Sequence, residues 1–233
     1  MVAKLSHAAY VPEGDGPFPT VIALHGWGAN SLDLLGHAPF LHGGKALMLC
    51  PQGPLSFPVG RGAAGYGWFP LPAVTSWQKA DLDSVRVSFQ AAAEALREFI
   101  DRAVETYPIN RDCVVVAGFS QGGLMAYELA LREPGRFAGL VAMSTWLPGV
   151  LAETLPRLPE HEGFPVLMLH GKDDPMIRVD LAREARETLR PYGVALQYRE
   201  IEKTGHQIGW EGLEVLVRWL EAKGFVRASA ASP

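Results

Sequence analysis

The chain has 233 residues, of which 48% are hydrophobic and 20% are charged. That is enough apolar material for one sizeable core, so we expect a single domain over residues 1–226. The 21 basic and 25 acidic residues give a formal net charge of −4, which excludes the strongly basic character of proteins that bind nucleic acid or an anionic membrane surface.

The N-terminal sequence MVAKLSHAAYVPEGDG has no apolar stretch long enough for the core of a signal peptide. No later window offers the roughly eighteen uncharged apolar residues that a membrane span needs. We therefore expect a soluble, cytoplasmic protein without integral membrane association. Cys50 and Cys113 each adjoin an apolar run, which predicts two buried free thiols rather than a disulfide or a pair of metal ligands.

Strand and helix patterns alternate along the chain. Short runs rich in β-branched and apolar residues predict strands at 20–24, 45–50, 113–119, 137–143, 164–169 and 195–201. Helical patterns lie between them, at about 81–107, 122–133, 179–189 and 210–222. Most of the strand runs do not alternate between apolar and polar residues, as is typical of strands buried on both faces of a parallel sheet. The order predicts a doubly wound α/β fold with helices flanking the sheet.

Two segments are longer than the connections that such a sheet usually has. Residues 51–80 are rich in glycine and proline and carry five large aromatic side chains, Phe57, Tyr66, Trp68, Phe69 and Trp77. Residues 144–163 include Trp146 and Leu147 and are too short for an independent cap domain. We predict two long loops here, no cap domain, and a disordered tail at 227–233.

The sequence Gly118-Phe119-Ser120-Gln121-Gly122 fits the pattern G-x-S-x-G between a predicted strand and a predicted helix. A serine at such a sharp turn is held in strained backbone, and the flanking glycines leave space for the neighbouring chain. This context predicts a nucleophile elbow with Ser120 as the nucleophile. The alternative is a serine that only caps the helix after a glycine-rich turn.

A serine hydroxyl needs a histidine base and an acid that orients the histidine, and in this fold they follow in the order serine, acid, histidine. The other six histidines come too early for that order: His7, His25, His37, His42, His161 and His170. Only His206, in a loop between the last strand and the last helix, has the right position. An exposed loop histidine without a catalytic role is the alternative.

The acid is expected at the end of the strand before His206, where Asp173 and Asp174 are adjacent. The pattern alone does not separate them, and such a pair can also act as helix caps. The negative oxygen formed in the reaction needs two backbone N–H donors. One should be Gln121, directly after the nucleophile, and the other should come from the His-Gly turn in 23–30.

Five segments, LHGWGAN, GFSQGG, MSTWLPG, HGKDDPMI and TGHQI, resemble those of the phospholipase/carboxylesterase family, which includes bacterial carboxylesterases and acyl-protein thioesterases. The resemblance spans roughly 20–219 in the same order and implies an α/β-hydrolase fold. It also implies that Asp174, directly before the proline, is the acid, and that the first oxyanion N–H belongs to Trp27. The position of Trp27 is commonly leucine in that family, and YGWFPLP in 51–80 only partly matches the family's aromatic element.

We therefore predict a serine carboxylesterase that uses Ser120, His206 and Asp174 and passes through an acyl-enzyme, without cofactor or metal. The pocket walls should come from the two long loops, so that four apolar side chains contact the acyl chain: Trp68, Phe69, Trp146 and Leu147. The partner is a small ester of short to medium acyl length, with no nucleic acid involved, and a homodimer is compatible with the sequence.

Two other functions fit the same residues. One is a thioesterase or lysophospholipase for long-chain substrates, because the same triad handles thioesters and loop shape decides the acyl length. The other is a binding protein on a hydrolase fold without significant turnover.

Overall fold

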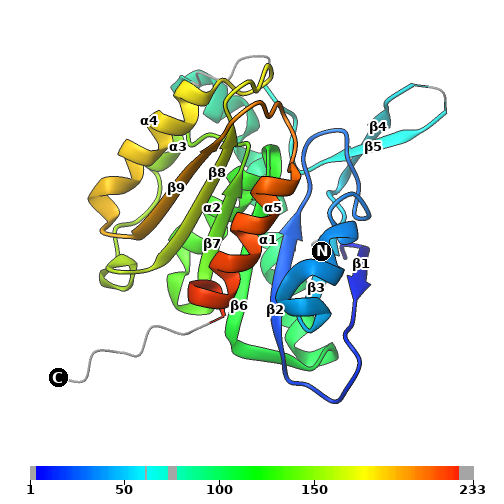
Figure 1. Cartoon of the computed structure of the whole chain (residues 1–233). Helices are drawn as coiled ribbons and strands as arrows, with labels where there is room; N and C mark the ends of the chain where they lie inside the picture. Colours follow the sequence, from blue (N-terminus) through cyan, green and yellow to red (C-terminus); the bar gives the residue numbers. More distant parts are fainter. Residues whose placement is uncertain (1–3, 61, 73–77, 226–233) are drawn as a thin grey trace.

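The computed structural model describes residues 4–60, 62–72 and 78–225. A seven-stranded sheet runs through the molecule in the order β1-β3-β2-β6-β7-β8-β9 (Figure 1). The first strand pairs antiparallel with β3, and the neighbouring pairs from β3 to β9 are parallel. The predicted tail at 227–233 and Trp77 lie outside the described residues.

Each of the six predicted strands overlaps a strand of this sheet. In sheet order the strands are β1 (His7–Tyr10), β3 (Leu47–Pro51), β2 (Phe18–Leu24), β6 (Ile109–Phe119), β7 (Gly139–Met143), β8 (Pro165–Gly171) and β9 (Ala195–Ile201). The α-helices are α1 (Lys79–Thr106), α2 (Gln121–Arg132), the short α3 (Gly149–Ala152), α4 (Val179–Leu189) and α5 (Trp210–Trp219). The 3₁₀-helical segments are η1 (Leu35–Gly44), η2 (Pro134–Arg136), η3 (Pro159–His161) and η4 (Arg190–Tyr192), and η5 (Leu220–Gly224) is π-helical.

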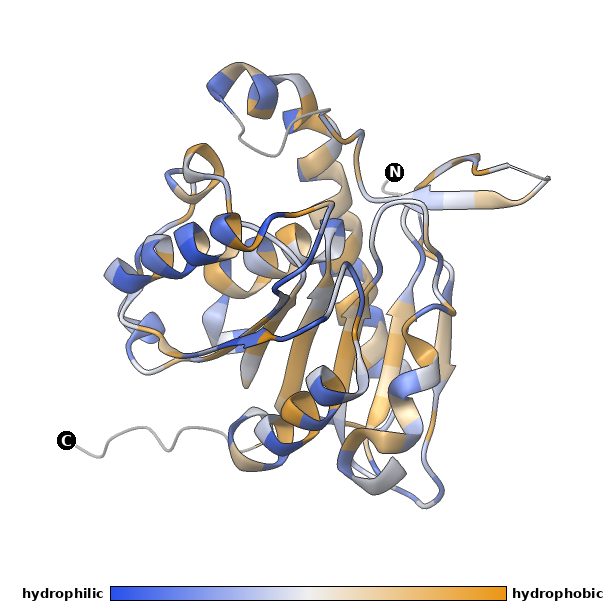
Figure 2. Cartoon of the chain, turned by 45° about the horizontal axis from the view of Figure 1, so that its top comes forward, coloured by the Kyte–Doolittle hydropathy of each residue, from blue (hydrophilic) through white to orange (hydrophobic). Residues whose placement is uncertain are grey.

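Helices cover both faces of the sheet, and the strand residues alternate between them. In β6, Val114 and Val116 pack with α1, α2, α3 and α4 on one face, whereas Val115 and Ala117 pack with η1 and α5 on the other. Each fully buried valine or leucine contributes roughly 1.5–3 kcal/mol. The two-sided burial explains why these runs are almost continuously apolar, as the orange colour of the central strands in Figure 2 shows.

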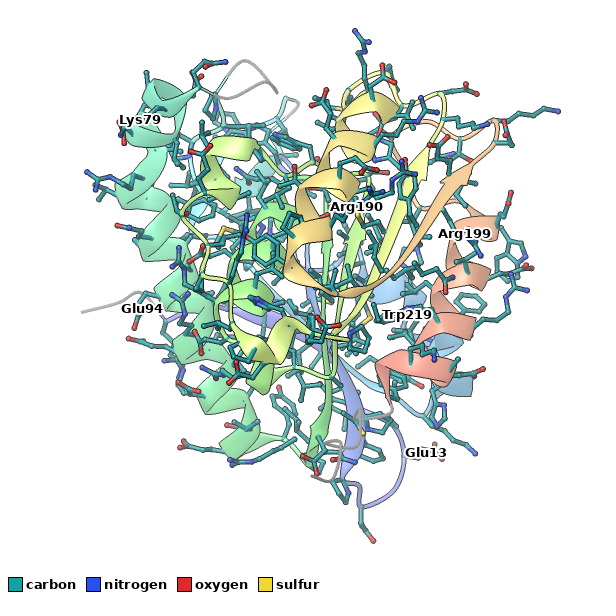
Figure 3. The ribbon with its side chains drawn as sticks, turned by 90° about the vertical axis from the view of Figure 1, so that its left-hand side faces the viewer. Glu13, Lys79, Glu94, Arg190, Arg199 and Trp219 are labelled. Carbon is teal, nitrogen blue, oxygen red and sulfur yellow. The ribbon has the colours of Figure 1, made fainter. Side chains whose placement is uncertain are left out.

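Figure 3 shows the layers from the side, with α1, the sheet and α5 in turn. Lys79 and Glu94 lie on α1, away from the sheet, and Trp219 lies on α5. The ring of Trp219 packs so closely on β7 that a Cβ atom at Gly139 would come within 2.7 Å of it. The predicted doubly wound α/β architecture is therefore confirmed.

The prediction of a plain loop over 51–80 was wrong in part. Residues Leu55–Pro58 (β4) and Ala64–Gly67 (β5) form an antiparallel hairpin that projects from the body in Figure 1. Its glycines and proline weaken the usual strand pattern, because Phe57 pairs with Gly65 rather than with a second apolar side chain. The edge strand β1 was also missed, since HAAY is short and only partly buried.

Both cysteines are free thiols. Cys50 is buried in β3, and burial raises the pKa of its thiol to about 12. Cys113 is only half-buried, so the expectation that both thiols are buried holds for Cys50 alone. The Cys113 thiol donates a hydrogen bond to the carbonyl oxygen of Phe225 at 3.1 Å.

Candidate active site

Ser120 lies at the turn between β6 and α2, with φ 52° and ψ −119°. A positive φ is uncommon for a residue with a side chain, and residues strained in this way cluster at functional sites. The turn is fixed from both sides: the Ser120 N–H donates to Met143 O at 2.9 Å, and its carbonyl accepts from Gly123 N at 2.9 Å and from Thr145 Oγ1 at 2.8 Å. The surrounding structure therefore holds the serine in this strained conformation.

The two glycines of the motif are required by close backbone contacts. A Cβ atom at Gly118 would lie 2.2 Å from the carbonyl oxygen of Gly122, and a Cβ atom at Gly122 would lie 2.1 Å from that of Leu24. Real Cβ atoms essentially never come so close. Ser120 occupies the N-cap position of α2, but its side chain makes no capping hydrogen bond. The sharp strand-to-helix turn that the sequence predicts is therefore present, and the serine hydroxyl does not cap the helix.

An acid and a histidine meet in the loops that follow β8 and β9. His206 Nδ1 lies 2.7 Å from Asp174 Oδ2, and Asp174 Oδ1 accepts from the N–H groups of Met176 and Ile177 at 2.9 Å each. The Asp174 side chain is fully buried, whereas that of His206 is 12% exposed. With Nδ1–H donating to the carboxylate, Nε2 is left as the free basic nitrogen.

Asp173 has a different environment, which pattern alone did not reveal. It is exposed, and its N–H donates to Thr204 O at 3.0 Å. The structure therefore brings Asp174, and not its neighbour, to His206. The difference arises because the chain turns sharply after β8, so that consecutive side chains point in different directions.

A second histidine, which sequence reasoning set aside, contacts the same carboxylate. His170 Nε2 lies 2.7 Å from Ile177 O and 3.5 Å from Asp174 Oδ2. Burial is the main cause that lowers the pKa of His170 below its ordinary value, so the ring is neutral at pH 7. Its Nε2–H donates to the Ile177 carbonyl, so His170 is a buried neighbour of Asp174.

His206 lies beside the elbow. Its ring packs against that of Phe119, the residue before Ser120, with ring centroids 4.8 Å apart. The strands β6, β7, β8 and β9 are neighbours and parallel, so the loops after them lie at the same edge of the sheet (Figure 1). This edge, where the carboxyl ends of the strands meet, brings Ser120, Asp174 and His206 into one region.

The loop after β2 lies against the other side of the serine. A Cβ atom at Gly26 would lie 3.2 Å from Ser120 Cβ, a tight contact, so the loop backbone approaches the serine closely. Trp27 follows it, and Gln121 is the first residue of α2, whose N–H has no partner within the helix. A helix N-terminus also favours negative charge. Backbone N–H groups from both segments are therefore available near Ser120.

Trp27 is 39% exposed, and its indole stacks on Phe57 with ring centroids 4.2 Å apart. A Cβ atom at Gly67 would lie 2.4 Å from the indole, so the ring rests on bare backbone of β5. Trp27 thus connects the loop to the β4–β5 hairpin.

The four predicted substrate-contacting residues fall into two pairs. Trp68 and Phe69 are 0% exposed and belong to the core, which argues against their contact with an acyl chain. Trp146 and Leu147 are also buried, but they line a cavity of about 590 Å³ together with α4. The sequence could not distinguish the two pairs, because an aromatic side chain indicates burial but does not indicate whether it packs in the core or lines a cavity.

A smaller cavity of about 250 Å³ lies against His206. Sequence reasoning did not anticipate it, because its walls come from distant segments. They are His25, Gly26, Ala29, Asp33, Leu34, His37, Phe119, His206, Gln207 and Ile208. The cavity gives His206 a space beside it that a substrate group could occupy.

In the described ranges, no cluster of three or more histidine, cysteine or carboxylate side chains could hold a metal ion. Among the helices of 4–60, 62–72 and 78–225, none is both long and apolar enough to cross a membrane. The cytoplasmic location and the homodimer stay predictions.

A family model described as Phospholipase/Carboxylesterase matches residues 5–223. The probable carboxylesterase SOBER1-like of Arabidopsis thaliana is 27% identical over 173 residues, which cover 74% of this chain and 64% of that protein. Acyl-protein thioesterase 1 of Neurospora crassa is 31% identical over 114 residues, 48% of this chain and 46% of that protein. The chain thus spans less than two thirds of the length of either relative.

The crystal structure of esterase PE8 matches with a TM-score of 0.78 and 24% identity, covering 95% of this chain and 100% of that one. At this identity the likeness shows the fold alone, and together with the family model it confirms the predicted α/β-hydrolase fold. The family and the named relatives are hydrolases of the esterase and thioesterase type.

Proposed function

The chain belongs to the phospholipase/carboxylesterase family, and we propose that it is a serine carboxylesterase for short to medium acyl-chain esters. The observation that carries the proposal is the 2.7 Å hydrogen bond between His206 and Asp174 at the sheet edge where Ser120 sits in its strained turn. A nucleophile, a base and an acid that orients the base are the parts that serine hydrolysis needs.

In the first half of the reaction, Ser120 Oγ bonds to the ester carbonyl carbon while its proton passes to His206 Nε2. Asp174 holds the imidazole in the tautomer with Nδ1 protonated and stabilises the charge that forms on the ring. The tetrahedral species then collapses, the bond to the alcohol oxygen breaks, and that oxygen takes the proton from His206. The acyl group stays on Ser120 as an ester.

In the second half, water gives a proton to His206 Nε2 and attacks the acyl-enzyme carbonyl. The bond to Ser120 Oγ breaks, Oγ regains the proton, and the carboxylic acid leaves. In both halves the backbone N–H groups of Trp27 and Gln121 stabilise the oxyanion, because they are fixed before the charge develops.

We propose that the two parts of the substrate occupy different cavities. The cavity against His206 is the space for the alcohol portion, since the leaving oxygen must reach the protonated imidazole. Trp146 and Leu147 border the larger cavity, and we propose that they contact the acyl chain. The wall that α4 adds to this cavity carries Arg183, Glu184, Arg186 and Glu187, and none of the three catalytic candidates lines it, so Trp146 and Leu147 are the side chains on which the chain-length test concentrates.

A thioesterase for long-chain substrates is the second candidate, supported by the 31% identity to acyl-protein thioesterase 1 of Neurospora crassa. The same residues would act on a thioester, with a thiol as leaving group. A binding protein without turnover is a third candidate, which the presence of all three catalytic residue types disfavours.

The test is a fluorophosphonate probe followed by a panel of p-nitrophenyl esters from acetyl to palmitoyl, with an octanoyl thioester alongside. We expect labelling at Ser120 and the highest kcat/KM between acetyl and octanoyl. A maximum at palmitoyl or on the thioester would favour the second candidate. No labelling and no turnover would refute the hydrolase mechanism.

A further inference from the structure

The Gly26–Trp27 peptide unit, which carries the proposed oxyanion N–H of Trp27, is held at its carbonyl. His25 Nδ1 lies 2.8 Å from Gly26 O. The Gly26 carbonyl and the Trp27 N–H belong to one planar trans peptide unit, so they point in opposite directions. A side chain that fixes the carbonyl therefore fixes the direction of the N–H.

The tautomer of His25 follows from its second contact. The Gly53 N–H donates to His25 Nε2 at 3.0 Å, so Nε2 is the acceptor and Nδ1 carries the hydrogen that Gly26 O accepts. Burial is the main cause that lowers the pKa of His25, which agrees with a neutral ring.

The preceding peptide unit is held by Trp68. Its indole Nε1–H donates to the carbonyl oxygen of His25 at 2.8 Å, and its ring packs against the His25 ring with centroids 5.1 Å apart. Two consecutive carbonyls of the loop are thus each bonded by a side chain. Trp68 supplies one of these bonds from a segment about forty residues away along the chain.

Trp68 is itself held by the residue after the nucleophile. Gln121 Oε1 accepts from the Trp68 N–H at 3.0 Å, and Gln121 Nε2 donates to Phe69 O at 2.7 Å. The Gln121 side chain is fully buried, so these bonds are shielded from water. The backbone N–H of the same residue is the other proposed oxyanion donor.

We propose that the Trp68 indole and the Gln121 side chain are positioning residues that set the two oxyanion donors relative to each other. The connection runs from Gln121 through Trp68 to the His25–Gly26–Trp27 loop. The inference rests on the proposed function, and it assigns Trp68 a role other than contact with an acyl chain.

The expected effect is confined to the transition state. A misplaced donor stabilises the oxyanion less but leaves ground-state binding nearly unchanged, so kcat falls while KM stays. Misplacement by about an ångström can cost up to roughly 10²-fold. We expect a fall in kcat of between about tenfold and 10²-fold.

The key variant is Trp68→Phe, which keeps a buried aromatic ring and removes the indole N–H. The matched control is Trp219→Phe, the same change at a tryptophan that is also buried but packs on the opposite face of the sheet. We expect kcat of Trp68→Phe to fall as above with KM within about twofold. Trp219→Phe should keep kcat even if its melting temperature falls.

A second variant, Gln121→Met, removes both side-chain bonds and keeps the backbone N–H. It should lower kcat similarly, and the double variant should lose less than the product of the single losses, because both residues act through one connection. Melting temperatures of all variants show whether each is folded. The proposal would be overturned if kcat fell in both Trp68→Phe and Trp219→Phe, in each case in proportion to the fall in melting temperature.

A measurement that needs no turnover separates this inference from the proposed function. In protein labelled with ¹⁵N-tryptophan, the backbone amide signal of Trp27 should move in Trp68→Phe and in Gln121→Met but not in Trp219→Phe. Unchanged Trp27 signals in the first two variants would refute the positioning role. A wild-type protein that neither labels with fluorophosphonate nor hydrolyses esters would instead refute the proposed function.

Discussion

The segments 51–72 and 144–163 both combine irregular structure with buried tryptophan, yet the two tryptophans have different surroundings. Trp68 is bonded through its indole to His25 and through its backbone to Gln121, and it lies in the core. Trp146 lines a cavity together with residues of α4. Aromatic residues in long connections therefore serve two purposes, support of neighbouring backbone and contact with open space.

The largest expected effect is on kcat and tests the proposed nucleophile and base. Ser120→Ala and His206→Ala should each lower kcat by about 10⁴-fold or more, because nucleophile and base act as a unit. Ester hydrolysis and circular dichroism spectra check this, the latter for intact folding. Activity near that of the wild type in either variant would mean that neither segment borders an active site of this kind.

The next effect distinguishes the two adjacent aspartates. Asp174→Asn should lower kcat by about 10³-fold to 10⁴-fold, since an amide favours the wrong imidazole tautomer. Asp173→Asn is the matched control, because its side chain is exposed, and it should change kcat less than about threefold. Steady-state kinetics decide the ranking, and the reverse order would make Asp173 the acid.

A smaller effect separates the two tryptophans directly. Trp146→Ala should leave kcat/KM for acetyl esters nearly unchanged and lower it about tenfold for octanoyl esters, which takes lost contact with two methylenes at roughly 0.8 kcal/mol each. Trp68→Ala should instead lower activity on all chain lengths alike and reduce stability by about 3–5 kcal/mol.

Chain-length profiles and urea unfolding of both variants provide the test. A profile for Trp68→Ala that steepens with chain length would return Trp68 to the acyl pocket. A flat profile for Trp146→Ala would show that the cavity beside α4 does not hold the acyl chain.

The smallest expected effect is on the pH dependence of stability and involves the two buried histidines near the site, His25 and His170. Burial lowers the pKa of His25 and of His170, so the unfolded chain binds protons near pH 6.5 that the folded chain does not. Their contribution to stability is present above about pH 6.5 and is lost as the pH falls toward their folded pKa values. Urea unfolding from pH 7.5 to 5.5 should show falling stability.

His170→Gln keeps a donor for Ile177 O and removes the titration, so its stability should fall less steeply over the same range. An identical slope in the variant and the wild type would show that His170 does not contribute to the pH dependence.

The sequence by itself determined the sheet, the elbow and the order of the catalytic candidates. Strands buried on both faces require continuous apolar runs, and the backbone contacts at Gly118 and Gly122 require glycine. The sheet and the elbow can therefore each be recognised from a short stretch of sequence. His206 followed from order along the chain alone. The choice of Asp174 needed the resemblance to a family, since the pattern left its neighbour equal.

Only the tertiary structure decided which aromatic side chains support the backbone and which line a cavity. The bonds that hold Trp68 come from His25 and Gln121, residues about forty and fifty positions away. The hairpin β4–β5 pairs an aromatic residue with glycine and so lacks the pattern of a strand. Such contacts depend on how distant segments pack, and a side chain's apolar character indicates only that it will be buried, not by what.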